Sequence, residues 1–311
     1  MARRLVRISF SCLLLVYVGY KVEWRIVFSA LLGVDFPFFI VSTILSVSGG
    51  FFMAWKYHLL LKNTVLALSV KRLMVIQAIS RFYALILPTA LGPEAVRWYK
   101  VTKNKQGKSF FLAATIYERL FFLMVLLGFG LAPLFLFPTH PEVAALRDRI
   151  LPLALICAGG LAALMLFLLL PSAQKPVKEL IKTGLYLSPG GKLDLLLDNL
   201  ALKDRSPALF LQLLFLTVCW QIGFILRIYF LFWAMELPFG VVEAAWMGSL
   251  VLLLQVLPVT FAGLGIREGA YAYLLTLSGL PAEEGVVIGL LFFTQMLIFA
   301  GTGAVLTLME K

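Results

Sequence analysis

Charged residues are scarce in this chain. Only 14% of its 311 residues are Asp, Glu, Lys or Arg, whereas 61% are hydrophobic. A soluble domain would carry about 25% charged residues, so the composition predicts an all-α polytopic membrane protein instead. The apolar runs are continuous and do not alternate over segments of about ten residues, which excludes an outer-membrane barrel. No stretch is polar enough for a second, soluble domain, and we expect a single integral membrane domain over residues 1–311.

Histidine and cysteine are also scarce. His58 and His140 are the only histidines, and the three cysteines lie in apolar segments without the spacing of metal ligands. No Gly-x-x-x-x-Gly-Lys-Ser/Thr run is present. We therefore expect no metal, no cofactor and no disulfide framework. The net charge of +11 does not call for a nucleic-acid partner, because Lys and Arg in loops also set the orientation of membrane proteins.

Long apolar runs alternate with charged segments. A retained first helix is expected at about residues 8–20. Full spans are then expected over residues 38–61, 110–137, 151–170, 207–235 and 284–309. The polar stretch 172–206 has one leucine-rich face and one charged face, which predicts an amphipathic helix on the cytoplasmic surface.

Two further apolar segments, 73–96 and 244–280, contain a Leu-Pro turn. Nine residues after each proline comes an arginine, so that Pro88 leads to Arg97 and Pro258 leads to Arg267. Broken helix and ionised side chains are costly in hydrocarbon, and chains keep them mainly where protein or a water-filled cavity surrounds them. We therefore predict two half-helix turns that face one polar site.

The basic residues indicate how the first turn lies in the membrane. Seven of them flank segment 73–96 on both sides: Lys62, Lys71, Arg72, Lys100, Lys103, Lys105 and Lys108. Because such residues favour the cytoplasm, we expect this segment to dip in and return. If segment 244–280 dips from the outer side, repeats over about 38–137 and 207–309 form an inverted pair with cytoplasmic termini. Full crossings at both places give eight spans and the same end positions, so both arrangements stay open.

Three motifs resemble one known family. They are Leu87-Pro88 with Glu94 and Arg97, Tyr117-Glu118-Arg119, and Gly263-Leu-Gly-Ile-Arg-Glu268. The chain resembles the lysylphosphatidylglycerol synthase transmembrane region, also described as flippase-like integral membrane proteins, over nearly its whole length. The resemblance implies lipid translocation. The soluble aminoacyl-transferase domain found in some members lies outside these 311 residues, and we expect no synthesis of lysylphosphatidylglycerol.

We expect the candidate site to bind a lipid head group. Arginine suits this task because its planar fork pairs with phosphate through two hydrogen bonds and keeps its charge. Glutamates near the arginines would hold them or meet a cationic part of the head group, and glycines would let the backbone approach closely. The candidate residues are Arg81, Glu94, Arg97, Glu118, Arg119, Gly263, Gly265, Arg267 and Glu268. The alternative is that these charges form internal ion pairs that lock the two turns.

Other polar residues in the spans have simpler interpretations. For Gln221, Gln255 and Gln295, interhelical hydrogen bonds are at least as good an explanation as a substrate path. Lys56 and Arg227 are expected to extend toward the membrane surfaces.

We predict that the protein binds and translocates an anionic phospholipid or a lipid-linked glycan precursor in the inner or plasma membrane. Anionic lipids are its expected partners. A second copy of the chain and envelope-synthesis proteins are further partners to test. One alternative function is an integral membrane transferase that acts on a lipid phosphate, for which Asp194 and Asp198 could hold Mg²⁺. Another is a non-catalytic scaffold of a cell-envelope lipid pathway.

Overall fold

The computed structural model describes residues 23–86, 92–103, 105–137, 141–169, 207–256 and 263–310, which form helices without a strand. The elements are α2 (Trp24–Leu32), α3 (Phe36–Leu61), α4 (Val70–Ile86), α5 (Gly92–Thr102), α6 (Lys108–Val125), the π-helical η1 (Leu126–Leu131), α7 (Ala132–Leu136), α8 (Pro141–Leu169), α11 (Pro207–Ala234), α12 (Val241–Val256), α13 (Ile266–Leu277) and α14 (Ala282–Met309). The all-α prediction is confirmed. The predicted helices at 8–20 and 172–206 lie outside the described residues.

Four of the described helices are long and apolar enough to cross a membrane. They cover Phe36–Leu61, Lys108–Leu136, Ala208–Ala234 and Ala282–Met309. The 26 residues of α3 measure about 39 Å at ~1.5 Å per residue, which exceeds a hydrocarbon core of about 30 Å. In Phe36–Leu61 and in Ala208–Ala234, only 22% of the most apolar 18-residue window is buried inside the protein. Apolar faces of these two helices therefore remain exposed for lipid. Four predicted spans are thus confirmed by length and composition.

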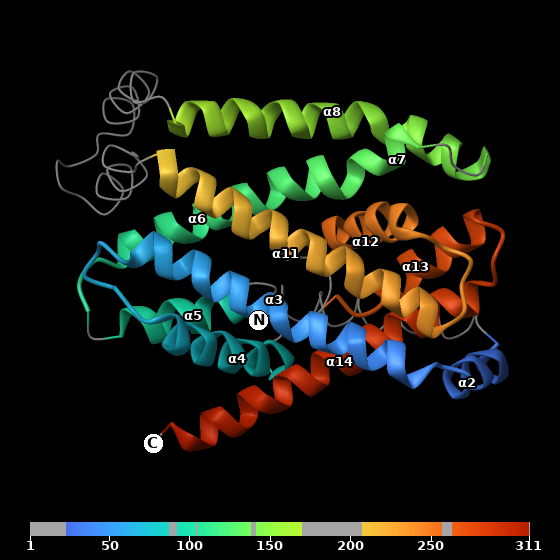
Figure 1. Cartoon of the computed structure of the whole chain (residues 1–311), viewed down its shortest axis with the longest axis horizontal. Coiled ribbons are helices and arrows are strands. Elements are labelled where there is room, and N and C mark those ends of the chain that lie inside the picture. The colour runs from blue at the N-terminus through green and yellow to red at the C-terminus, as the bar shows by residue number, and fades with distance from the viewer. Residues whose placement is uncertain are drawn as a thin grey trace, which may run out of the picture.

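Helices α3 and α11 run antiparallel and form the centre of the bundle (Figure 1). At one end, the Asp35 amide donates to the carbonyl oxygen of Ala234 at 2.8 Å. Further along, Gly49 lies against the Trp220 indole, where an added Cβ would come within 3.1 Å of the ring nitrogen. The lack of a side chain at Gly49 therefore lets the two helices approach closely.

Two short antiparallel helix pairs complete the core. The pair α4–α5 runs inward from one end of the bundle and back, and α12–α13 does the same from the opposite end (Figure 1). Each packs on elements from the other half of the chain. Helix α4 lies against α14, where a Cβ on Gly303 would be 2.1 Å from the Ala78 carbonyl oxygen, and α12 lies against η1, where Gly130 meets Ser249. The Leu-Pro turns themselves, at 87–91 and 257–262, lie outside the described residues.

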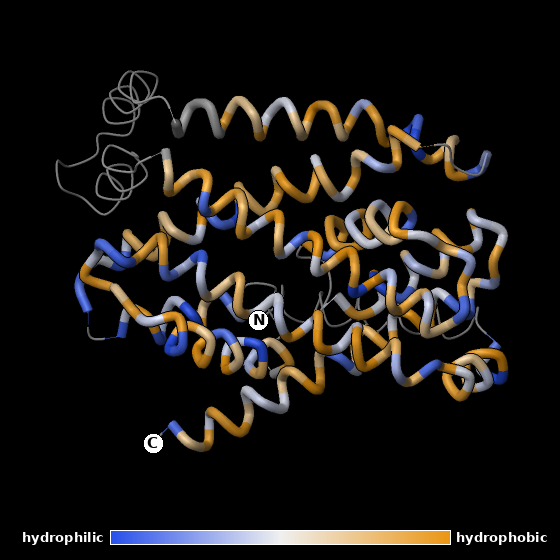
Figure 2. The backbone as a smooth tube through the Cα atoms, in the orientation of Figure 1, coloured by the Kyte–Doolittle hydropathy of each residue, from blue (hydrophilic) through white to orange (hydrophobic). Residues whose placement is uncertain are grey.

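The two ends of the bundle differ in charge. Near the α3–α4 and α5–α6 connections, the described residues carry seven basic side chains, and Glu310 at the end of α14 pairs with two of them, Arg72 and Lys100. The opposite end holds eight acidic residues and three arginines: Glu23, Arg25, Asp35, Glu142, Arg147, Asp148, Arg149, Glu236, Glu243, Glu283 and Glu284. Figure 2 shows the hydrophilic residues gathered mainly toward these ends, with apolar helix between them.

Candidate functional site

A polar cavity of about 130 Å³ lies halfway along the long helices. Its lining residues come from α3, α4, α11, α12, α13 and α14: Ser46, Arg81, Phe224, Arg227, Gly248, Leu252, Gln255, Arg267, Tyr271, Phe292 and Met296. Ser46 is ten residues from the first residue of α3, or about 15 Å at ~1.5 Å per residue. A cavity at this depth would face the middle of the hydrocarbon core. We call it the central cavity.

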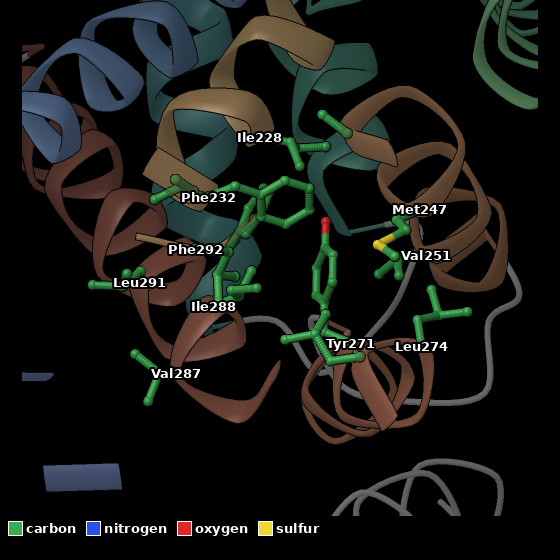
Figure 3. Packing of buried hydrophobic residues seen from close by; sticks show 14 of the residues in the cluster. Ile228, Phe232, Met247, Val251, Tyr271, Leu274, Val287, Ile288, Leu291 and Phe292 are labelled. Carbon is green, nitrogen blue, oxygen red and sulfur yellow. The ribbon is translucent and has the colours of Figure 1, made fainter. Parts of the chain in front are cut away.

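A tightly packed apolar layer borders the central cavity, since Tyr271 and Phe292 belong to both. Tyr271 rises from α13 between Met247 and Val251 on one side and Ile288 and Phe292 on the other (Figure 3). Its ring stacks on that of Phe292 with a centroid separation of 5.8 Å, and only 1% of the residue is exposed. This packing fixes the first turns of α13, from which Arg267 reaches the cavity.

The start of α13 is built around Glu268. Its Oε2 accepts a hydrogen bond from the Gly265 amide at 2.7 Å, while Oε1 accepts from Arg267 Nε at 3.0 Å. Gly263 and Gly265 have φ of +75° and +84°, a region that favours glycine, so both have a conformational role in this turn. Gly289 of α14 leaves room for the glutamate, because a Cβ there would lie 2.7 Å from Glu268 Cγ. The predicted pairing of Arg267 with Glu268 is present, and both residues are buried.

Arg227 also faces the central cavity, and the prediction that it extends to the membrane surface is wrong. Its Nε donates to Gln295 Oε1 at 2.7 Å, and Gln295 Nε2 donates to Ser42 Oγ at 2.8 Å. Ser42 Oγ in turn donates to the Arg227 carbonyl at 2.8 Å, which closes a ring of hydrogen bonds between α3, α11 and α14. The guanidinium carbon lies 4.0 Å from the centre of the Phe292 ring. The predicted interhelical role of Gln295 is confirmed, but its partner is a site arginine.

Arg81 is the least constrained of the three arginines. Its guanidinium carbon lies 4.6 Å from the centre of the Phe299 ring, a favourable cation–π distance. Among the described residues it has no hydrogen-bond or ion-pair partner, so the glutamate partner suggested for it does not occur there. Its N–H groups are therefore available to a ligand in the cavity.

Positive charge exceeds negative charge in the central cavity. The described lining has three guanidinium groups, and the only carboxylate in contact with any of them is that of Glu268. The turn segments 87–91 and 257–262 contain no acidic residue in their sequence. Two guanidinium charges at mid-bundle thus have no carboxylate partner among the described residues. Such a cavity is suited to an anion, which it would hold by charge-assisted hydrogen bonds.

The remaining candidate residues form a separate cluster nearer the basic end. Glu118 of α6 accepts a hydrogen bond from Lys56 Nζ of α3 at 2.9 Å, and their side chains are only 3% and 2% exposed. The prediction that Lys56 extends to the surface is therefore wrong. Glu118 neutralises a lysine and has no direct ion pair with an arginine in the described chain.

Glu94 joins two arginines in the same cluster. It pairs with Arg97 at 3.3 Å and with Arg119 of α6. Arg97 is buried, with its guanidinium carbon 5.4 Å from the centre of the Tyr57 ring, whereas 42% of the Arg119 side chain is exposed. Glu94 Oε2 and Arg97 Nε are buried without a hydrogen-bond partner among the described residues. The nine predicted site residues therefore lie in two groups. In one of them, Arg81 and Arg267 line the central cavity, and Gly263, Gly265 and Glu268 form the turn at the start of α13 that holds Arg267.

A larger cavity of about 380 Å³ lies between α8 and the α6–η1–α7 helix. Its lining, which includes Leu127, Phe135 and Leu155, is entirely apolar and offers no group that recognises a phosphate. Among the described residues, no three His, Cys, Asp or Glu side chains gather as metal ligands would.

The apolar spans and the buried arginines define a helical membrane protein with a cationic site in its core. A family model described as the lysylphosphatidylglycerol synthase TM region matches residues 4–302, and the chain belongs to this family. The resemblance seen in the motifs is thereby confirmed. No curated protein and no solved structure matches the chain.

Proposed function

We propose that the protein binds the phosphate of an anionic lipid, or of a lipid-linked glycan precursor, in the central cavity and carries it between leaflets. The observation that carries this proposal is the convergence of Arg81, Arg227 and Arg267 at mid-bundle. An uncompensated guanidinium in hydrocarbon is costly, and arginines kept there commonly mark a substrate path. The phosphate would occupy the cavity while the lipid tails stay in the surrounding bilayer.

The proposed orientation places the basic end of the bundle in the cytoplasm of the inner or plasma membrane. Seven basic side chains and one acidic side chain at that end agree with the excess of Lys and Arg in cytoplasmic loops. The C-terminal end of α14 would then be cytoplasmic, with Glu310 bound to Arg72 and Lys100. The basic residues would also attract anionic lipids of the inner leaflet.

The proposed mechanism uses the two short helix pairs as re-entrant elements. Helices α4–α5 would dip from the cytoplasmic side and α12–α13 from the outer side, so that residues 38–137 and 207–309 form inverted repeats. Support comes from the packing of each pair on the opposite half of the chain. Rocking of one repeat against the other would open the central cavity to alternate leaflets.

The cluster near the basic end would receive the head group first. Arg119 is partly exposed, Arg97 is buried, and both share Glu94. A phosphate that displaces Glu94 from either arginine would also reach the unpaired Nε of Arg97. In this proposal Glu118 has an indirect role, since it holds Lys56 and helps to keep α3 and α6 together.

Reconstitution into liposomes tests this function. Transbilayer movement of fluorescent anionic phospholipids is measured for the wild type, for Arg267→Ala with Glu268→Gln, and for Arg227→Gln. We expect movement in the wild type and its loss in both variants. Arg149→Gln, at an exposed position in α8, is the matched control and is expected to retain movement.

Unchanged movement in site variants of normal stability would falsify the proposed site. A chemically modified lipid would support the transferase instead, and neither movement nor product would support a scaffold.

A further inference from the structure

The charge excess of the central cavity indicates what kind of phosphate it accepts. Both carboxylate oxygens of Glu268 are already occupied, one by the Gly265 amide and the other by Arg267. The guanidinium groups of Arg81 and Arg227 have no ion-pair partner among the described residues. A ligand that restores neutrality in this apolar setting must therefore carry two negative charges. A monoanion would leave one buried guanidinium uncompensated, which is costly in a low-dielectric environment.

The positions of the three guanidinium groups also favour a doubly charged phosphate. The arginines approach from α4, α11 and α13, so they surround a ligand from three directions. A terminal phosphate has three unesterified oxygens, whereas the phosphate of a diester lipid has two. Arg227 already uses its Nε for Gln295, and Arg267 uses its Nε and Nη2 for Glu268. The terminal N–H groups of Arg227, the Nη1 group of Arg267 and the whole Arg81 guanidinium are left for the ligand. Three separate cationic donors match three free oxygens.

The lining offers little to a cationic part of a head group. A ligand amine needs a free carboxylate, and the oxygens of Glu268 are committed within the protein. The other described polar lining residues, Ser46, Gln255 and Tyr271, are neutral. A head group with an attached amino acid would bring a positive charge into a cavity that already has an excess of two.

We propose that the central cavity selects a terminal, doubly charged phosphate: a lipid phosphomonoester, or a lipid diphosphate, in preference to a phosphodiester lipid. This inference rests on the proposed function, because it names the substrate class of the same site. It also gives the three arginines a specificity role, which simple attraction of any anionic lipid would not require.

Affinity measurements on the purified full chain in neutral detergent test this inference. Phosphatidic acid and phosphatidylglycerol with identical acyl chains serve as the monoester and the diester, and phosphatidylcholine serves as the zwitterionic reference. At about pH 8 we expect phosphatidic acid to bind about tenfold more tightly than phosphatidylglycerol, the effect of one more charge-assisted hydrogen bond. The preference should shrink at about pH 5, since the second ionisation of a phosphomonoester lies near pH 6.

One substitution and one soluble anion complete the test. Arg81→Gln removes one positive charge and is expected to reduce the preference for phosphatidic acid to about twofold or less, whereas the exposed control Arg149→Gln keeps it.

Equal affinities of the wild type for the two lipids would overturn the inference and leave the proposed function standing. Absence of binding to all the lipids would overturn both. If inorganic phosphate binds as tightly as phosphatidic acid, the site belongs to a soluble anion and the lipid assignment is wrong. The wild-type comparisons decide the matter even if Arg81→Gln fails to fold.

Discussion

The ion pair between Lys56 and Glu118 allows a quantitative test of how this membrane protein tolerates buried charge. Its N–O distance is 2.9 Å, and both side chains are almost fully buried. Removing one partner leaves the other charge without compensation, which typically costs about 3–5 kcal/mol. We therefore expect Lys56→Met and Glu118→Gln each to lower the free energy of unfolding by about that amount.

The double variant separates the pair from the rest of the fold. Replacing both partners by uncharged residues of similar size removes the desolvation cost together with the attraction, so the net change is often small. Lys56→Met combined with Glu118→Gln is therefore expected to be more stable than either single variant, with a coupling of about 2 kcal/mol or more. Unfolding by SDS in mixed micelles measures all four proteins. Lys105→Met, at an exposed position near the same end, controls for the loss of a lysine.

Two results would refute this reasoning. If each single variant costs less than about 1 kcal/mol, the pair behaves like an exposed salt bridge and water must reach it. If the losses of unfolding free energy in the two single variants add up in the double variant, Lys56 and Glu118 stabilise the protein independently. The 2.9 Å contact between them is then not the source of that stability.

Two further predictions concern helix packing and pH. Gly289→Ala should destabilise the protein by about 1–3 kcal/mol and weaken lipid binding, because its Cβ would lie 2.7 Å from Glu268 Cγ; Gly301→Ala, with no atom within 4 Å of the added Cβ, is the control in thermal denaturation. The hydrogen bond from Lys100 lowers the pKa of Glu310 below its ordinary value of 4.5. Because the folded-state pKa is the lower one, this stabilisation is present above pH 4.5 and lost as pH falls through the folded value. Wild type and Glu310→Gln should therefore differ by a few tenths of a kcal/mol at neutral pH and converge in acid, and a constant difference would contradict the assignment.

Features that depend on local sequence could be predicted. The long spans follow from apolar length alone, as the expected span over residues 38–61 does in α3. The contact of Arg267 with Glu268 joins neighbours in the sequence, so the motif was sufficient to suggest it.

Features that depend on helix packing could not be predicted in the same way. Arg227 lies seven residues before the end of α11, and a long flexible side chain at that position can reach a membrane surface. It faces inward because Gln295, 68 residues later, supplies its acceptor. Lys56 similarly finds Glu118, 62 residues later. The available signal was the presence of polar side chains inside apolar spans, which shows that partners are needed without showing which residues they are.

The two charge clusters differ in how much of their charge is already balanced. Near the basic end, Lys56 pairs with Glu118 and Arg97 pairs with Glu94, and the remaining arginine of that cluster is partly exposed. In the central cavity the carboxylate of Glu268 balances one guanidinium of three. In the cluster near the basic end, ion pairs offset the buried charges, so stability already gives a reason to keep them. Stability does not explain the charges of the central cavity in the same way, because Arg81 and Arg227 have no carboxylate partner among the described residues to offset their desolvation cost. Under the proposed function, a ligand that enters and leaves this cavity would be the reason for keeping those charges there.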